Sequence, residues 1–208
     1  MSGIGIILLF LLSGLCVSGA APAGAAGPLS ALARAQEGID TCDSGLFNSA
    51  VDLGAITDKA ATALLSAMRK ASVEGRLEGP AALIVSLAGT VSDGGQDKLI
   101  RQLLHSEIKS FLAAGINSGW FAGRENPAPG GRGFASYLKN IPRGRREIVP
   151  GKIVSEAGDK AVVTGRFIDP QAGALPLLLE LERRDGVWRV VEIKNAAELF
   201  TLAGRGGG

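Results

Sequence analysis

The chain has few of the residues that carry metal and redox chemistry. Its 208 residues include one histidine, His105, and two cysteines, Cys16 and Cys42. No second histidine or cysteine stands at a metal-ligand spacing, so no recognisable zinc or iron site is present. The glycine-rich phosphate loop and the Gly-x-Ser-x-Gly motif of hydrolases are also missing. The sequence therefore predicts no cofactor, no metal and no catalytic residue.

The chain also lacks a strong excess of either charge. Its 22 Lys and Arg residues against 20 Asp and Glu residues leave a net charge of +2. A dedicated nucleic-acid binding protein carries a much larger positive excess, so we expect no nucleic-acid partner. Aromatic residues make up only 5% of the chain, whereas the hydrophobic content of 46% is ordinary for a globular protein.

Charge is missing altogether from the first part of the chain, which has no charged side chain before Arg34. Ile4–Val17 is an almost unbroken apolar run, too short to span a bilayer comfortably but suited to a secretory signal. Ser18 and Ala20 supply small residues for a signal peptidase. We expect residues 1–20 to be a signal peptide and the protein to be periplasmic or secreted. An uncleaved membrane anchor is the alternative.

Cleavage of this signal would remove Cys16 and leave Cys42 as the only cysteine, so the mature chain would contain no internal disulfide. Asp40 and Asp43 flank Cys42, and negative neighbours oppose the formation of a reactive thiolate. We interpret Cys42 as a small buried hydrophobic residue and His105 as a structural helix residue.

Helices are expected in the first two thirds of the chain, after a flexible lead-in at residues 21–28. Apolar spacing predicts them at Leu29–Asp43, near Leu46, at Asp58–Val73 with Thr57 as N-cap, at Ala81–Ala88, at Asp97–Ala114 with Gly115 as terminator, and at Phe134–Asn140. Residues 118–133 are rich in Gly and Pro and form an expected loop after the longest of these helices.

Strands are expected in the last third. Asp185-Gly186 is a strong hairpin signal, because both central residues of a type I′ turn need a positive φ. Leu177, Leu179 and Leu181 alternate with Leu178, Glu180 and Glu182, the period of a strand with one dry face. The predicted strands are Lys152–Glu156, Lys160–Ile168, Leu175–Arg184 and Val187–Lys194.

The predicted fold class is α+β, with N-terminal helices packed on a C-terminal four-stranded antiparallel meander, since the connections between the strands are short. We expect residues 29–203 to form a single domain and residues 204–208 to be a disordered tail.

The order of these elements and the segment DGVWRVVEIKN, Asp185–Asn195, resemble the cystatin-like roll of exported bacterial NTF2-like proteins. The order also resembles, more distantly, phospholipid carriers of the toluene-tolerance type. The segment Asp43–Phe47 leading to Val51–Leu53 is similar to the opening of several uncharacterised periplasmic families. The resemblance implies an apolar concavity between helices and sheet, which would bind a lipid or other small hydrophobic ligand, or an envelope protein partner. An enzyme using the same cavity and a membrane-anchored interaction protein are alternatives, because this fold hosts many functions.

Two sets of candidate site residues emerge. The candidate cavity lining is Trp120, Phe121, Leu177, Leu179, Leu181 and Trp188, with a plain core as the alternative. The candidate patch for an anionic partner is the basic group Arg132, Lys139, Arg143, Arg145 and Arg146. For this patch the alternative is a solvated loop.

The signal-peptide prediction is tested by N-terminal sequencing of the protein purified from an expressing bacterium. We expect a mature chain that begins at or near Ala21, because the small residues Ser18 and Ala20 precede that position. A chain that retains the apolar run would contradict this prediction and favour the membrane anchor.

Overall fold

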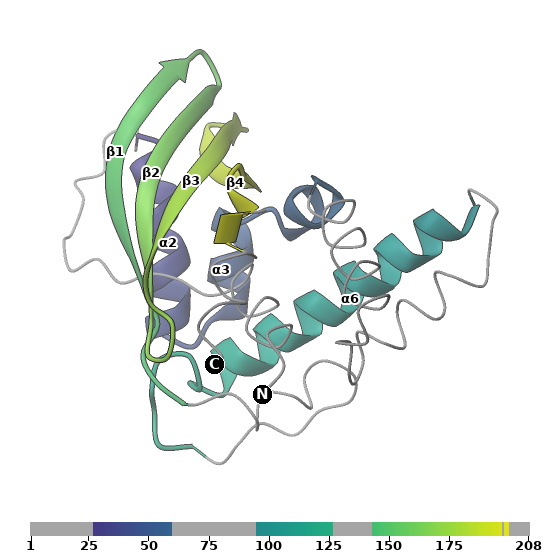
Figure 1. The fold of residues 1–208 in the computed structure, drawn as a ribbon, viewed down its shortest axis with the longest axis vertical. Coiled ribbons are helices and arrows are strands. Elements are labelled where there is room, and N and C mark those ends of the chain that lie inside the picture. The colour runs from purple at the N-terminus through teal and green to yellow at the C-terminus, as the bar shows by residue number, and fades with distance from the viewer. Residues whose placement is uncertain (1–26, 60–94, 127–142, 197, 200–208) are drawn as a thin grey trace.

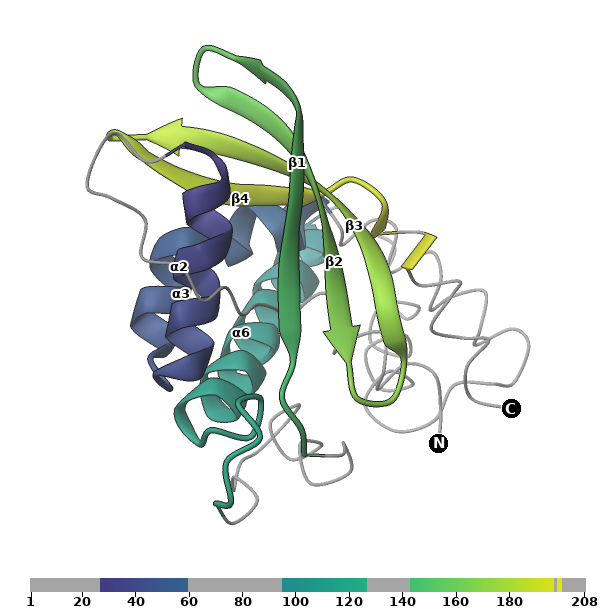
Figure 2. The same ribbon diagram turned by 90° about the vertical axis from the view of Figure 1, so that its left-hand side faces the viewer.

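A computed structural model describes residues 27–59, 95–126, 143–196, 198 and 199. Four antiparallel strands form one curved sheet, and helices cover its concave side (Figure 1; Figure 2). This arrangement confirms the predicted α+β class and the antiparallel meander. The signal peptide, the predicted helices at 81–88 and 134–140, and the tail lie outside the described residues. No helix in the described ranges is long and apolar enough to cross a membrane.

The helices are α2 (Leu29–Asp40), α3 (Ser44–Ala50) and α6 (Gly95–Asn117). The prediction ended α6 at Gly115, but the helix continues one half-turn beyond this glycine. A Cβ at Gly115 would collide with the ring of Phe121, which packs against the helix there. Gly115 therefore allows close packing of an aromatic ring, and it does not terminate the helix.

The first helix was predicted to end at Asp43, but α2 ends at Asp40, and a short junction leads from it into α3. The N–H of Cys42 donates to the carbonyl of Ile39, and the N–H of Asp43 donates to that of Gly38. These two bonds, with Cys42 at a φ of 60°, form a Schellman motif, whose left-handed residue is usually glycine. Asp43 then caps α3, since its carboxylate accepts the N–H of Leu46 at 2.9 Å.

The helical residues 53–59 begin earlier than predicted. Asp52 caps them, because its carboxylate accepts the N–H of Ala55 at 2.9 Å. Thr57 was the predicted N-cap, and this prediction is wrong. Thr57 is buried inside the helix, and its hydroxyl donates to the carbonyl of Leu53 at 2.6 Å. The rest of the predicted helix to Val73 lies outside the described residues.

The strands are β1 (Glu147–Ala157), β2 (Lys160–Asp169), β3 (Gly173–Arg184) and β4 (Val187–Ile193), in the order β1-β2-β3-β4. The Asp185-Gly186 turn joins β3 and β4, with φ values of 53° and 75°. Both values are positive, as a type I′ hairpin requires, so the predicted turn is confirmed.

The two edges of the sheet differ. Val51 pairs with Val190 on the outer side of β4, and the N–H of Asp52 donates to the carbonyl of Val190 at 2.9 Å. No segment in the described ranges pairs with the outer side of β1, whose hairpin with β2 projects past the helices (Figure 2). Pro150, which has no N–H, and two register shifts interrupt this edge.

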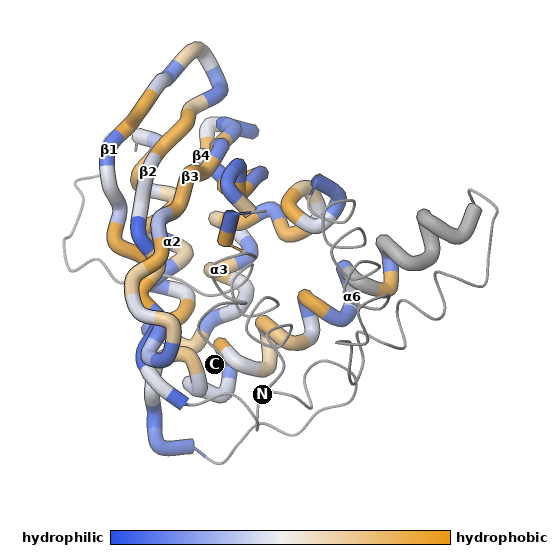
Figure 3. The backbone as a smooth tube through the Cα atoms, viewed as in Figure 1, coloured by the Kyte–Doolittle hydropathy of each residue, from blue (hydrophilic) through white to orange (hydrophobic). Residues whose placement is uncertain are grey.

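The core lies between the concave face of the sheet and the helices. Leu175, Leu177, Leu179 and Leu181 of β3 are all buried, while the residues between them are more exposed. Their apolar partners come from α2 and α6 and include Leu32, Ile39, Ile108, Phe111, Leu112 and Ile116. Figure 3 shows apolar positions recurring along both the strands and these helices. Burial of each such side chain contributes about 1.5–3 kcal/mol to the free energy of folding.

The left-handed conformation of Cys42 gives a stability prediction. Cys42→Gly should be more stable than Cys42→Ala by about 1 kcal/mol, because a Cβ disfavours a φ of 60° and glycine lacks one. Urea unfolding of the two variants measures the difference in the free energy of unfolding. Both variants lack the thiol, so the difference between them reports the effect of the Cβ on the backbone. Equal stabilities would show that this position carries no backbone strain.

Candidate functional site

Five of the six candidate cavity residues belong to the core. The exposed fractions are 0% for Phe121, 6% for Leu177, 4% for Leu179, 0% for Leu181 and 2% for Trp188. A cavity large enough for a ligand would leave accessible surface on the side chains that line it. These five residues pack against the chain's own apolar side chains instead, in one continuous cluster. Trp120, the sixth, is half-buried at the border of this cluster.

Arg146 does not lie in an exposed basic patch, although the sequence predicts one there. Its side chain is 1% exposed, and its Nε lies 3.0 Å from Oδ2 of Asp169, whose side chain is 3% exposed. The guanidinium also lies over the ring of Phe121, 5.2 Å from the ring centroid. Arg146 is therefore a structural residue that pairs with the end of β2, and this part of the prediction is wrong.

Further bonds hold the buried pair in place. The Oδ1 atom of Asp169 accepts the N–H groups of Gln171 and Ala172, at 2.8 and 3.0 Å, and so shapes the turn between β2 and β3. The N–H of Arg146 donates to the carbonyl of Phe121 at 2.9 Å. Burial lowers the pKa of Arg146 from its ordinary value, and the Asp169 carboxylate offsets part of this effect. A buried charge needs such a partner.

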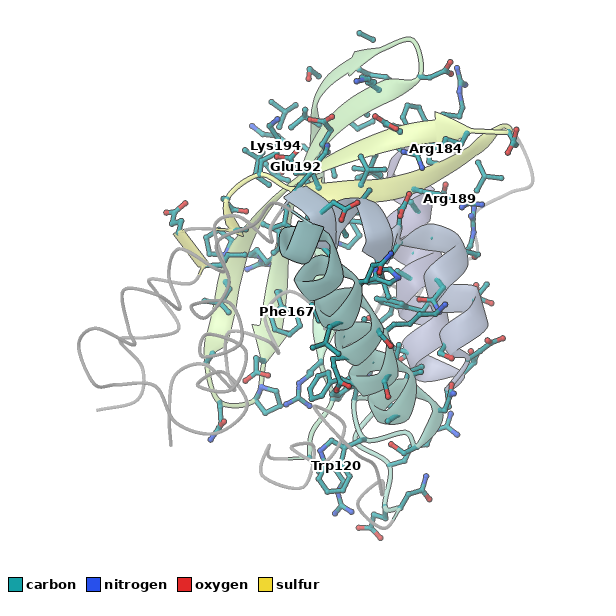
Figure 4. The ribbon with its side chains drawn as sticks, turned by 90° about the vertical axis from the view of Figure 1, so that its right-hand side faces the viewer. Trp120, Phe167, Arg184, Arg189, Glu192 and Lys194 are labelled. Carbon is teal, nitrogen blue, oxygen red and sulfur yellow. The ribbon has the colours of Figure 1, made fainter. Side chains whose placement is uncertain are left out.

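Arg143 and Arg145 are exposed, as predicted, and Arg124 joins them from the segment after α6. Ala122 pairs with Arg145 in an antiparallel bridge, which brings the two segments together. The guanidinium carbon of Arg143 lies 6.0 Å from the ring centroid of Trp120. We call Trp120, Arg124, Arg143 and Arg145 the arginine face. Figure 4 shows Trp120 at the opposite end of the molecule from Lys194 and Glu192.

The arginine face meets the C-terminal end of α2. The Nη2 atom of Arg124 donates to the carbonyl of Asp40 at 2.5 Å, and the Nη2 atom of Arg145 lies 3.6 Å from the Asp40 carboxylate. Sequence reasoning missed Arg124, because the Ala122–Arg145 bridge joins positions 23 residues apart and has no local signal. Arg132 and Lys139 of the predicted patch lie outside the described residues.

The outer face of the sheet carries a second group of charges, which are paired. Lys194 donates a hydrogen bond to Glu180 at 3.0 Å and lowers the pKa of that carboxyl. Arg184 does the same for Glu182 at 2.7 Å. Glu180 and Glu182 are thus each balanced by a cation on this face of the strand. Figure 4 labels Arg184, Arg189, Glu192 and Lys194 around β3 and β4.

Two further ion pairs fasten the segment after α3 to the sheet. Arg184 donates to the Asp52 carboxylate at 2.7 Å, and Lys59 donates to Glu192 at 2.8 Å. Asp52 is already the cap of the helical residues 53–59. Arg184 and Glu192 thus hold this segment, which assigns these two residues a structural role.

The remaining residues that could take part in catalysis or metal binding do not form a cluster in the described part of the chain. Within the described part of the chain, no three residues among His, Cys, Asp and Glu are placed to hold a metal ion. His105 is half-buried on α6, and Cys42 is a half-buried free thiol at the α2–α3 junction. The arginine face is therefore the candidate functional site.

Comparisons of the chain with protein-family models, with curated proteins and with solved structures find no match. The fold and the arginine face therefore rest on this structure alone.

The buried pair gives a prediction with a matched control. Asp169→Asn should lower the free energy of unfolding by about 3–5 kcal/mol, because it leaves the buried guanidinium of Arg146 without a counter-charge. Asp159→Asn removes the same charge from the exposed pair Arg183–Asp159 and should cost below about 1 kcal/mol. Urea unfolding of both variants checks the difference. Similar losses in the two would contradict a structural role for the buried pair.

Proposed function

We propose that this protein is an exported, non-enzymatic interaction domain of the cell envelope that binds an acidic protein partner through the arginine face. The observation that carries the proposal is the cluster of three exposed arginines, from two chain segments, beside the half-buried Trp120. Arginine and tryptophan are among the residue types that most often dominate the binding energy of protein interfaces. Guanidinium groups also form paired hydrogen bonds with carboxylates.

The way the arginines are held supports this proposal. Arg143 is stacked against Trp120, and Arg124 is bonded to the carbonyl of Asp40, so both side chains have lost part of their freedom before a partner arrives. Such preorganisation lowers the entropic cost of binding. The buried Arg146 below them fixes the backbone of the segment that carries Arg143 and Arg145.

A small hydrophobic ligand is the weaker proposal. The side chains expected to line its cavity are 0–6% exposed, apart from Trp120, and they belong to one apolar cluster. An enzyme is also weaker, since the carboxylates Glu180 and Glu182 are engaged by Lys194 and Arg184. Export remains an expectation from the apolar N-terminal run.

Binding of a fluorescent oligo-glutamate peptide of about twelve residues to the purified protein tests the proposal. We expect measurable binding at low salt that weakens as salt screens the charges. Arg143→Ala and Arg145→Ala should each raise the Kd by about fivefold or more, as hot-spot residues do.

Arg183→Ala is the matched control, because Arg183 is an exposed arginine at the end of β3 opposite to Gly173, which pairs with Asp169 beside the arginine face. It should leave the Kd unchanged. Equal weakening by all three variants would show unspecific charge attraction. Absence of peptide binding, or binding only to vesicles of anionic phospholipid, would overturn the proposed protein partner.

A further inference from the structure

The arginine face already contains a carboxylate supplied by the chain itself. Asp40 is the last residue of α2, and its Oδ2 lies 3.6 Å from Nη2 of Arg145. Its other carboxylate oxygen, Oδ1, accepts a hydrogen bond from the side chain of Gln36 at 2.9 Å. The carboxylate of Asp40 thus lies against Arg145, one of the arginines that the proposed partner would contact.

The dipole of α2 disfavours a negative charge at this position, although the Asp40 carboxylate also bonds to Gln36 within the helix. The C-terminal end of a helix carries a partial negative charge, so an aspartate there is unfavourable, whereas a cation is favourable. The bond from Arg124 goes to the main-chain carbonyl of Asp40 and needs no carboxylate. The carboxylate of Asp40 thus opposes the dipole of its own helix and lies toward Arg145.

The contact between Asp40 and Arg145 is also easy to replace. The two side chains are 38% and 57% exposed, and their closest charged atoms are 3.6 Å apart. Exposed ion pairs of this kind contribute little to stability. A carboxylate from a partner that forms a shorter, paired contact with Arg145 can therefore displace Asp40 without disturbing the fold.

We infer that Asp40 is an internal competitor for the arginine face, and this inference rests on the proposed function. In the free protein, Asp40 partly neutralises Arg145, so an isolated carboxylate binds weakly. A ligand with several neighbouring carboxylates displaces Asp40, because it gains contacts to Arg143 and Arg124 at the same time. Asp40 thus selects for densely acidic segments, as a repulsive element in a binding site does.

The test uses Asp40→Asn and measures the Kd for the oligo-glutamate peptide. The Kd should fall by about fivefold, since Arg145 loses its internal counter-charge and a group that repels the peptide is removed. Glu37→Gln is the matched control. Glu37 is an exposed glutamate one turn earlier on α2, so this variant removes the same charge from the same helix. The control should leave the Kd close to that of the unchanged protein.

The effect of Asp40→Asn on the Kd must also depend on the presence of Arg145. In an Arg145→Ala background, Asp40→Asn should change the Kd much less, which a double-mutant cycle measures. An unchanged Kd for Asp40→Asn, an equal effect of Glu37→Gln, or an unchanged effect in the Arg145→Ala background would each overturn the inference while the proposed function stands. Absence of peptide binding by the unchanged protein would remove both.

Discussion

The arginine face depends on the buried ion pair between Arg146 and Asp169. This pair joins the end of β2 to the segment that enters β1, and the N–H of Arg146 ties that segment to Phe121 after α6. In an extended segment, neighbouring side chains point to opposite sides. Arg146 therefore points into the protein, and Arg145 points to solvent. The buried guanidinium of Arg146 holds the backbone in place, and the neighbouring Arg145 presents a positive charge at the surface.

Much of the sheet was predictable because its signals are local. The alternation of Leu177, Leu179 and Leu181 and the Asp185-Gly186 turn specify a strand and a hairpin within a few residues. The start of β1 at Glu147 was missed, because Pro150 and Gly151 are atypical of strands and hide the pattern. The cap at Asp52 was missed for another reason. Thr57 has the chemistry of a cap, but the pairing of Val51 with Val190 fixes where the helix begins.

The candidate site was only half predictable. A basic run in the sequence reveals that arginines are close together, but it does not reveal which one is buried. The burial of Arg146 depends on Asp169, which lies 23 residues later at the far end of a strand. Trp120 and Phe121 are adjacent and similar in character, yet only Phe121 is fully buried, because Gly115 leaves room for its ring. Such outcomes are decided by tertiary contacts, which no local pattern contains.

The interrupted edge of β1 has a consequence for how the protein behaves at high concentration. An uncovered edge strand is a template on which other chains can grow into fibrils, and β1 carries the exposed apolar residues Ile153 and Val154. Pro150 removes a donor from this template, and the two register shifts bend it away from a flat ladder. Such interruptions disfavour the pairing of a second chain with this edge. The same irregularities that hid β1 from sequence reasoning thus protect the folded protein against polymerisation.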